Sequence, residues 1–416
     1  MERDVYKSFV AHYIVVSTQD SINKIFELNE IAKKQAEEYT KKREIYSEIK
    51  ESGKTFIGIA GLRGVGKTTI LKQLLLECKN SIYISLDTLS NIDLFDLAKS
   101  LFENYNIKIL LFDEINYYNN WQLALKNIYD FTDIKIYFTS SVAIDIINSK
   151  TDLSRRAIIK KMYPFSFREY IYFNKNKKLD KLNIKDINNM EKLKEINKYD
   201  YLFEDYVSGG NIPTRIKEKN PEIFKNILEK ILEKDLVYSL KFTGKDIINV
   251  RSMLEFISNS NIDNMSYSNI AKNININKYK AIKYIWALEK AFVLNVVKPS
   301  GTNVIKEPKI MLCPPFRFCY LKNKDIKDIL GQLREEFFVE SAKMNNIDVF
   351  YLKGNRGEKT LDYIASINKT KYIFEIGGKN KTRAQILNIK NEERYILTQP
   401  ANIVNPYRPL IFFGFL

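Results

Sequence analysis

The chain has 416 residues, of which 45% are hydrophobic and 13% aromatic, so it is long enough to bury the cores of several domains. Lysine and arginine outnumber aspartate and glutamate by 66 to 50, a net charge of +16 that suits a polyanionic partner such as nucleic acid. A Lys- and Asn-rich genome would impose the same excess, so charge alone leaves both readings open. Three scattered cysteines and one histidine exclude a Cys/His zinc site.

The ends and the apolar content of the chain predict its compartment. Free thiols in a chain of this length fit a reducing cytosol. The sequence opens without a signal-peptide pattern, and no window is apolar enough to span a bilayer. We therefore expect a cytoplasmic protein that does not enter a membrane.

Residues 1–50 are rich in strong helix formers and predict an N-terminal helical segment. From residue 51 to residue 170, short β-branched runs alternate with helical patterns, which predicts an α/β fold with a parallel sheet and helices on both faces. The expected strands lie at residues 55–60, 81–86, 108–112, 135–139 and 158–163, and the expected helices lie at 67–77, 94–103 and 121–129.

A glycine-rich turn between the first expected strand and helix matches G-x-x-x-x-G-K-[ST] at every fixed position. Such a turn presents backbone N–H groups to phosphate at a helix N-terminus. Lys67 is expected to reach the β- and γ-phosphates of ATP, and the Thr68 hydroxyl is expected to ligate Mg²⁺. The residues expected to bind Mg²⁺-ATP are Gly61, Gly64, Gly66, Lys67, Thr68, Thr69 and Asp113.

Two acidic residues end the apolar strand at 108–112. Asp113 is expected to hold Mg²⁺, and Glu114 to polarise the attacking water. The next strand ends in Thr139, Ser140 and Ser141. Ser141 could sense the γ-phosphate or the water, with simple turn formation as the alternative.

The motifs together resemble one family. The residues that carry the resemblance are Gly61–Thr69, Asp113–Ile115 with Trp121, Thr139–Ser141, Leu153–Arg156, Tyr163–Tyr170 and Gly209–Pro213. They look like prokaryotic AAA-type P-loop ATPases that carry a winged helix and a C-terminal domain of the restriction-endonuclease, PD-(D/E)xK type. The resemblance implies an arginine finger near Arg156; Arg155 replaces the usual glycine, so both arginines stay candidates, and a phosphate-remote ion pair is the alternative.

The resemblance also implies how the rest of the chain is divided. Residues 51–170 would be the ATPase core and 171–244 a helical lid with an Asn/Lys-rich insertion. The insertion, at residues 174–200, looks like a solvated helix or a variable segment. Residues 245–325 would form the winged helix, and residues 326–416 the nuclease-like domain.

Within the expected winged helix, Ser268 and Asn277 are plausible N-caps of two successive helices. Helical spacing places Ile282, Ile285, Leu288 and Phe292 toward a core. Lys278, Lys280 and Lys283 would then face outward, where they could contact DNA phosphates. The alternative is a module that docks only on protein.

The C-terminal domain offers carboxylates for a second metal. The candidates are Glu335 on a helix, and Asp362 and Glu375 on paired strands that turn at residues 368–370. The expected E-x-K is missing, because Gly377 takes the lysine position and the nearest lysine is Lys379. We expect a degenerate or very selective nuclease, and Glu335 could also be a surface charge.

The sequence therefore predicts an ATPase that uses ATP and Mg²⁺, works on DNA and could form a homo-oligomer. Two alternatives stay open. One is an ATP-gated signalling or scaffolding module with protein partners. The other is an ATP-driven endonuclease, which requires an intact C-terminal site.

Overall fold

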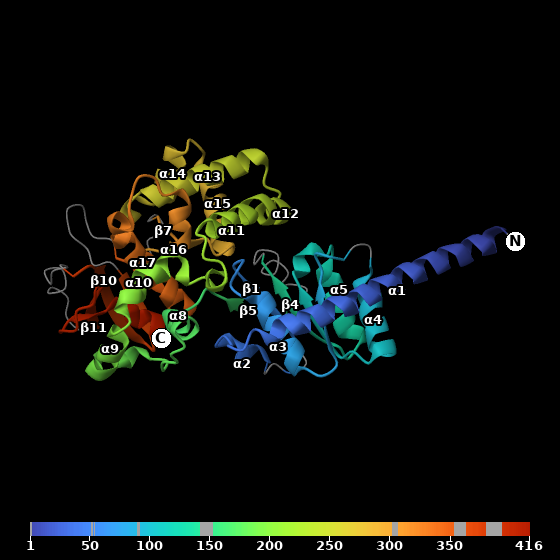
Figure 1. The fold of residues 1–416 in the computed structure, drawn as a ribbon. Helices are drawn as coiled ribbons and strands as arrows, with labels where there is room; N and C mark the ends of the chain where they lie inside the picture. Colours follow the sequence, from blue (N-terminus) through green and yellow to red (C-terminus); the bar gives the residue numbers. More distant parts are fainter. Residues whose placement is uncertain are drawn as a thin grey trace. The chain divides into compact units, whose positions relative to one another are not determined.

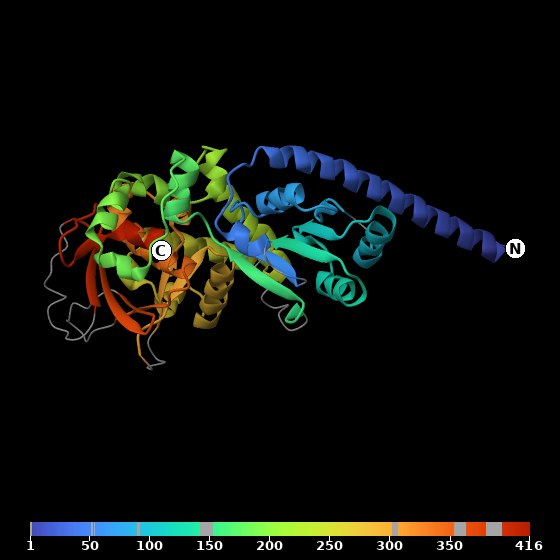
Figure 2. The same cartoon turned by 90° about the horizontal axis from the view of Figure 1, so that it is seen from below.

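A computed structural model describes residues 2–50, 53, 55–89, 92–141, 153–301, 307–352, 363–379 and 393–416, with side chains from residue 20 onward except that of residue 264. The chain divides into two compact units, Met1–Met162 and Tyr163–Leu416. Figures 1 and 2 show the elements of each unit from two directions. Among the described residues, no helix is both long enough and apolar enough to cross a membrane.

The first unit is built on a five-stranded sheet in the order β2-β3-β4-β1-β5. Every neighbouring pair in it is parallel, which confirms the α/β prediction. The strands are β1 (Phe56–Gly61), β2 (Ser81–Ser85), β3 (Ile109–Asp113), β4 (Lys135–Ser140) and β5 (Ala157–Met162), each within a residue or two of its predicted position.

Helices connect and cover this sheet: α1 (Glu2–Glu37), α2 (Ile45–Lys50), α3 (Lys67–Glu77), α4 (Leu94–Tyr105) and α5 (Trp121–Phe131). The helix α3 begins and ends where the sequence predicts. The helix α1 packs on α3 and on the edge strand β2, and Ile22, Ile25 and Ala32 bury its inner face. An N-terminal helix thus covers one edge of the sheet.

The second unit opens with the two motifs that resemble the family's junction. Ser166 accepts a hydrogen bond from the backbone N–H of Glu169 and begins α8 (Phe167–Lys175) in a capping box. The backbone N–H of Phe165 donates to the carbonyl of Asn211 (2.7 Å), so the two motifs meet. A Cβ on Gly210 would lie 2.6 Å from the ring of Tyr170, which explains the glycine there.

The Asn/Lys-rich segment is not a solvated helix, so that part of the sequence prediction is wrong, and the alternative of a variable segment stays a prediction. It contains η2 (Ile184–Asn188) and α9 (Met190–Asn197), and its leucines and isoleucines are buried in the main core of the second unit. Its backbone is tied to the end of the chain, because the N–H of Leu182 donates to the carbonyl of Phe415 (2.7 Å). The polar composition hid isoleucines and leucines at helical spacing.

A helical region follows, with η3 (Asp200–Leu202), α10 (Phe203–Asp205), α11 (Glu222–Lys230), α12 (Val237–Leu240), α13 (Gly244–Asn259), α14 (Tyr267–Asn273) and α15 (Lys278–Lys290). It ends in the antiparallel pair β6 (Leu294–Val297) and β7 (Lys309–Leu312). Asn277 caps α15 as predicted, but Ser266 rather than Ser268 caps α14. Three helices and a hairpin have the element order of a winged helix, and that assignment stays a prediction.

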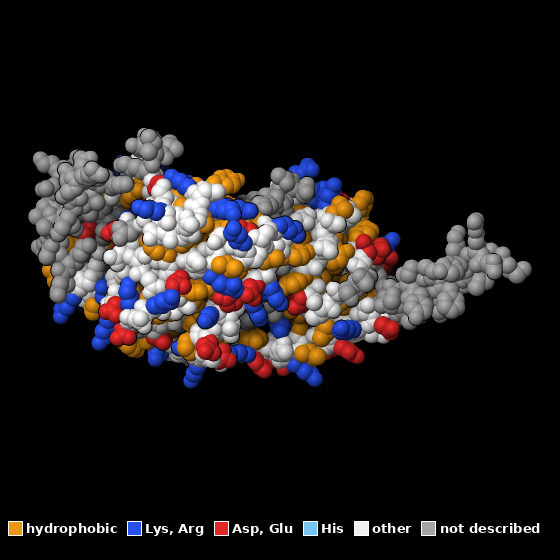
Figure 3. Space-filling view, turned by 90° about the horizontal axis from the view of Figure 1, so that it is seen from above, with side chains coloured by type: hydrophobic (Ala, Val, Ile, Leu, Met, Phe, Trp, Pro, Cys, Tyr) orange, Lys and Arg blue, Asp and Glu red, His pale blue; other side chains and the backbone are white. Residues whose placement is uncertain are grey.

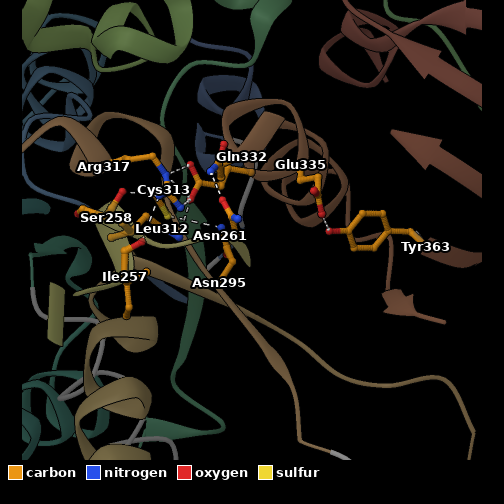
Figure 4. A network of polar contacts seen from close by, with 11 residues as sticks. Ile257, Ser258, Asn261, Asn295, Leu312, Cys313, Arg317, Gln332, Glu335 and Tyr363 are labelled. Atoms are coloured by element: carbon orange, nitrogen blue, oxygen red, sulfur yellow. Dashed lines mark hydrogen bonds and ion pairs between the residues drawn. The ribbon is translucent and has the colours of Figure 1, made fainter. Parts of the chain in front are cut away.

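A buried ion pair joins this region to the next helix, α17 (Ile326–Met344). Arg317, on α16 (Pro314–Arg317), and Glu336 are both fully buried, and the guanidinium donates three hydrogen bonds to the carboxylate. Arg317 also donates to the carbonyls of Ile257 (3.1 Å) and Ser258 (2.7 Å), at the end of α13 (Figure 4). The predicted boundary at residue 325 is therefore crossed by buried polar contacts.

The C-terminal sheet has the order β12-β11-β10-β9-β8. Its strands are β8 (Val349–Tyr351), β9 (Tyr363–Ile367), β10 (Thr370–Gly377), β11 (Glu393–Thr398) and β12 (Tyr407–Pro409). The predicted hairpin between β9 and β10 is present, and it turns at Asn368 and Lys369, both with positive φ. The strands β10, β11 and β12 run parallel, whereas β8, β9 and β10 pair antiparallel, so the sheet is mixed.

Candidate functional site

Three of the sequence motifs gather at the carboxyl edge of the first sheet. In that sheet β4 lies between β1 and β3, and all three strands point the same way. The loop after β1, the acidic pair at the end of β3 and the hydroxyls at the end of β4 therefore lie at one edge. Strands two places apart are about 10 Å from each other, a distance that a nucleoside triphosphate with its metal can bridge.

The loop after β1 has the backbone that phosphate binding requires. Gly64 (φ 83°) and Gly66 (φ 95°) adopt left-handed conformations that favour glycine. A Cβ on Gly61 would lie 2.2 Å from the carbonyl oxygen of Met162, so only glycine fits there. Lys67 is buried, and its ammonium donates to the carbonyls of Gly61 (2.9 Å) and Leu62 (3.0 Å). Thr68 and Thr69 follow in the first turn of α3.

Asp113 is buried at the end of β3, and hydroxyl groups hold both of its carboxylate oxygens. Tyr83 on β2 donates to Oδ2 (2.7 Å), and Thr139 on β4 donates to Oδ1. These bonds fix the plane of the carboxylate. The Asp113 carboxylate and burial both raise the pKa of Tyr83 above its usual value, burial being the larger cause. Tyr83 therefore stays a hydrogen-bond donor at neutral pH.

Glu114 is held in a backbone conformation that non-glycine residues rarely adopt, with φ 53° and ψ 53°. Its N–H donates to Thr139 Oγ1 (2.9 Å). Its Oε2 accepts hydrogen bonds from the hydroxyl (2.9 Å) and the N–H (3.3 Å) of Ser141. The structure thus brings the candidate base and the candidate sensor into direct contact.

Sequence patterns did not point to three residues beside this site. Tyr83 lies inside a strand, and no motif singles it out. Asn29, on α1, accepts a hydrogen bond from the Tyr83 N–H (2.8 Å) and so caps an edge strand. Arg43, between α1 and α2, donates to the carbonyl of Val65 in the glycine-rich loop (3.1 Å). All three act across long sequence separations, and only the fold reveals them.

The two candidate arginine fingers, Arg155 and Arg156, lie at the amino edge of the same sheet, where its strands begin. They precede β5, whose first residue Ala157 pairs with Phe56 at the start of β1. The glycine-rich loop begins five residues later on β1, about 17 Å away along the strand. Arg156 makes a bidentate ion pair with Asp130 (2.9 and 2.7 Å), whereas Arg155 is exposed. Neither arginine is near the phosphate site of its own chain.

The C-terminal carboxylates are only partly placed. Glu375 is buried on β10, and Glu335 on α17 accepts a hydrogen bond from the Tyr363 hydroxyl (2.5 Å; Figure 4). Asp362 lies outside the described residues. The strand β10 ends at Gly377, so Lys379 follows it in an exposed turn. Within the described part of the chain, no group of three His, Cys, Asp or Glu side chains could hold a metal ion.

Two of the lysines on α15 contact other side chains of the second unit. Lys278 forms an ion pair with Glu307, which also accepts hydrogen bonds from Ser268. Lys283 lies over the ring of Phe242, 5.0 Å from its centroid. Ile282 was predicted to face the core, and this is wrong, because the side chain is 37% exposed. Its helical position falls at the edge of the buried stripe that Ile285 and Leu288 occupy.

Comparison with known families agrees with the geometry at the first sheet. Residues 53–171 match a family model described as an AAA domain. This segment is therefore similar to AAA domains. The match supports an ATPase-type function for the first unit. Residues 201–327 match a second model, described as a domain of unknown function, and so its expected winged helix gains no support from this match.

Two curated proteins of the archaeon Methanocaldococcus jannaschii are similar over longer stretches. The uncharacterized protein MJ1637 is 33% identical over 301 residues, which cover 66% of this chain and 63% of that protein. The uncharacterized protein MJ1544 is 27% identical over 370 residues, 81% of this chain and 76% of that protein. The chain thus spans somewhat less than two thirds of the length of the first relative.

Solved structures give only weak similarity. A mutant of RuvB from Thermotoga maritima is 17% identical, with a TM-score of 0.26, over 68% of this chain and 90% of that chain. The Drosophila origin recognition complex bound to AT-rich DNA and Cdc6 is 8% identical, with a TM-score of 0.21, over 73% and 93%. Both TM-scores are too low to indicate a shared fold.

Proposed function

We propose that the chain binds Mg²⁺-ATP at the carboxyl edge of its first sheet and hydrolyses it. The observation that carries this proposal is the convergence of Lys67, Asp113 and Glu114 on one edge, each held by hydrogen bonds. The buried Lys67 ammonium now bonds to two loop carbonyls, and phosphate oxygens would replace them. Thr68 and Asp113 would hold Mg²⁺, which when bound neutralises charge on the phosphate oxygens.

The roles of the remaining residues follow from their contacts. Glu114 would accept a proton from the attacking water, because its carboxylate lies beside the Ser141 hydroxyl, whereas Asp113 is engaged by Tyr83 and Thr139. Ser141 donates to Glu114 and would hold that carboxylate until the γ-phosphate arrives. Loop N–H groups from Gly64 and Gly66 would bind the phosphates, with Thr69 beside them at the start of α3.

The position of Arg155 supports a homo-oligomer. A finger at the amino edge of the sheet cannot reach a phosphate at the carboxyl edge of its own chain, but it can reach that of a neighbouring copy. Because Asp130 engages Arg156 and leaves Arg155 exposed, Arg155 is the better candidate for this contact. Each active site would then be completed by a second copy of the chain.

We further propose that ATP turnover is coupled to nucleic acid bound by the second unit. Five lysines and one glutamate lie between Met265 and Phe292, which supports a polyanionic partner. A protein partner is the second candidate. On the face drawn in Figure 3, Lys and Arg side chains alternate with acidic ones, and hydrophobic side chains lie between them. No continuous basic surface covers that face.

The C-terminal domain is proposed to lack general DNA cleavage, because Lys379 is exposed beyond the end of β10 rather than held beside Glu375. An ATP-driven endonuclease would need another cation to take that role.

ATP turnover tests these proposals, measured alone and with single-stranded or double-stranded DNA, while the integrity of the DNA is followed on gels. We expect phosphate release that rises with DNA while the DNA stays intact. Absence of turnover under every condition contradicts the ATPase proposal, and equal turnover with and without DNA contradicts the coupling. Nicking that requires Glu375 restores the endonuclease reading.

A further inference from the structure

The solvent face of α15 carries a regular strip of aromatic and basic side chains. Tyr279, Lys283, Trp286 and Lys290 are spaced four, three and four residues apart, which places them along one side of a helix. Tyr279 is 78% exposed and Trp286 is 38% exposed, although rings of this size are usually covered. We call these four residues the α15 strip; Tyr279 and Trp286 are about 10 Å apart along the axis.

The buried side of the helix explains why these rings face solvent. Ala281, Tyr284, Ile285 and Leu288 fill the core contacts of α15, and all four are fully or almost fully buried. These four side chains make the core contacts of α15, whereas Tyr279 is mostly exposed and Trp286 is 38% exposed. Tyrosine and tryptophan are common contact residues because each combines an apolar ring with a polar group.

The lysines decide between the partners that such rings could contact. An apolar protein surface pressed against the strip would have to desolvate the ammonium groups of Lys283 and Lys290, which is costly without acidic partners. Nucleic acid pairs phosphates with lysines and offers the flat faces of its bases to aromatic rings. Bases in an intact duplex are stacked on one another, so their faces are covered. The strip therefore suits unpaired bases.

We infer that the α15 strip binds single-stranded nucleic acid, with bases stacked on Tyr279 and Trp286 and phosphates held by Lys283 and Lys290. This inference rests on the proposal that the second unit binds nucleic acid and specifies the form that is bound. It also moves the contact surface away from Lys278, whose ammonium is engaged by Glu307.

The chain offers a direct spectroscopic test, because it has only two tryptophans. Trp121 is buried in the first unit, so the variant Trp121→Phe leaves Trp286 as the single reporter. The full-length variant is titrated with oligo(dT), oligo(rU), a duplex, and an abasic oligonucleotide of equal length. Stacking should quench the Trp286 emission with either single strand, but not with the abasic strand.

Substitutions measure the contribution of each ring to binding. Tyr279→Ala and Trp286→Ala should each weaken single-strand affinity roughly 5- to 150-fold, whereas Tyr279→Phe should keep it, because a phenyl ring still stacks. Tyr201→Ala serves as the matched control, since Tyr201 is 70% exposed on another element. Circular dichroism checks that every variant is folded.

The possible outcomes distinguish this inference from the proposal that the second unit binds nucleic acid. Quenching by single strands together with the loss in both alanine variants supports stacking on the strip. Equal affinity for the abasic strand, or a preference for duplex with no quenching, overturns stacking while nucleic-acid binding stands. If no nucleic acid binds, both the stacking inference and the nucleic-acid proposal fall, and a protein becomes the partner to seek.

Discussion

Lys67 and Glu114 are proposed to perform separable steps, one in binding and one in hydrolysis. Lys67→Ala removes the only lysine of the loop, so both nucleotide affinity and turnover should collapse. Glu114→Gln keeps the shape and the Ser141 contact but removes the base, so turnover should fall about 10²-fold or more while Mg²⁺-ATP still binds. Phosphate release and binding of a fluorescent ATP analogue measure the two effects. Near-normal turnover of Glu114→Gln would remove Glu114 from this role.

Tyr83 holds the Asp113 carboxylate from a neighbouring strand, so removal of its hydroxyl should weaken Mg²⁺ binding. In Tyr83→Phe the carboxylate loses one of its two hydroxyl donors and must be ordered when the metal binds. Hydrogen bonds to charged groups are worth about 1.5–3 kcal/mol, so the Mg²⁺ concentration for half-maximal nucleotide binding should rise roughly 10-fold. Tyr137→Phe, another buried tyrosine of the sheet, is the control. Unchanged Mg²⁺ dependence would reduce Tyr83 to a packing residue.

At the scale of elements, the buried pair Arg317–Glu336 links α13, α16 and α17. Removal of one partner leaves a buried charge, so Arg317→Leu or Glu336→Leu should destabilise the second unit by about 3–5 kcal/mol. The double variant Arg317→Leu/Glu336→Leu removes both charges and should recover much of this loss. Urea unfolding followed by circular dichroism gives the three values. Additive losses in the double variant would mean that the pair is not coupled.

Asp200, in η3, gives the second unit a predictable response to pH. Burial raises the pKa of this carboxyl to about 6, against the hydrogen bonds from Ala401 and Gln399. The folded state therefore binds a proton more tightly than the unfolded state, so stability should fall as pH rises from about 4 to 6 and then stay level. A shift of this size corresponds to roughly 3 kcal/mol. Asp200→Asn should remove this pH dependence and raise the free energy of unfolding at neutral pH, measured by urea unfolding. If the pH dependence persists in the variant, other titratable groups cause it.

The strands and helices of the first unit could be predicted because their patterns are local. Each apolar run of β-branched residues ends at a motif or a turn, and Lys67 marks the start of α3. Contacts that cross the sheet carry no such pattern, which is why Asn29 and Tyr83 were missed. Composition misled at residues 174–200, since Asn and Lys dominate a segment whose few leucines and isoleucines are buried.

The residues of the candidate site also differ in how far the sequence predicts their roles. The roles of Lys67, Asp113 and Glu114 follow from residue type and order, and the structure brings these residues to one edge. The roles of Arg155 and Ile282 depend on which edge or which side of a helix they occupy, and spacing alone did not give that. The pair of Asp362 and Glu375 stays a prediction, because Asp362 lies outside the described residues.

For the whole molecule, the proposed finger can be tested by mixing two inactive proteins. Arg155→Ala should lower turnover roughly 10³-fold, because one arginine next to the γ-phosphate contributes about that much. Lys67→Ala should be inactive for a different reason. In a mixed assembly some sites combine an intact loop from one copy with an intact Arg155 from the other, so turnover should partly return. Arg156→Ala serves as the comparison, and turnover of the mixture no higher than the sum of its parts would contradict completion by a neighbour.

The contacts of Arg317 also bear on how such a chain can evolve. The side chain belongs to the segment before residue 325, while its carboxylate partner belongs to the segment after it. Recombination at that boundary would deliver a C-terminal segment with a buried carboxylate and no cation, or the reverse, and either product would fold poorly. The two segments should therefore be inherited together. A relative that carries a different C-terminal segment should also have lost the arginine.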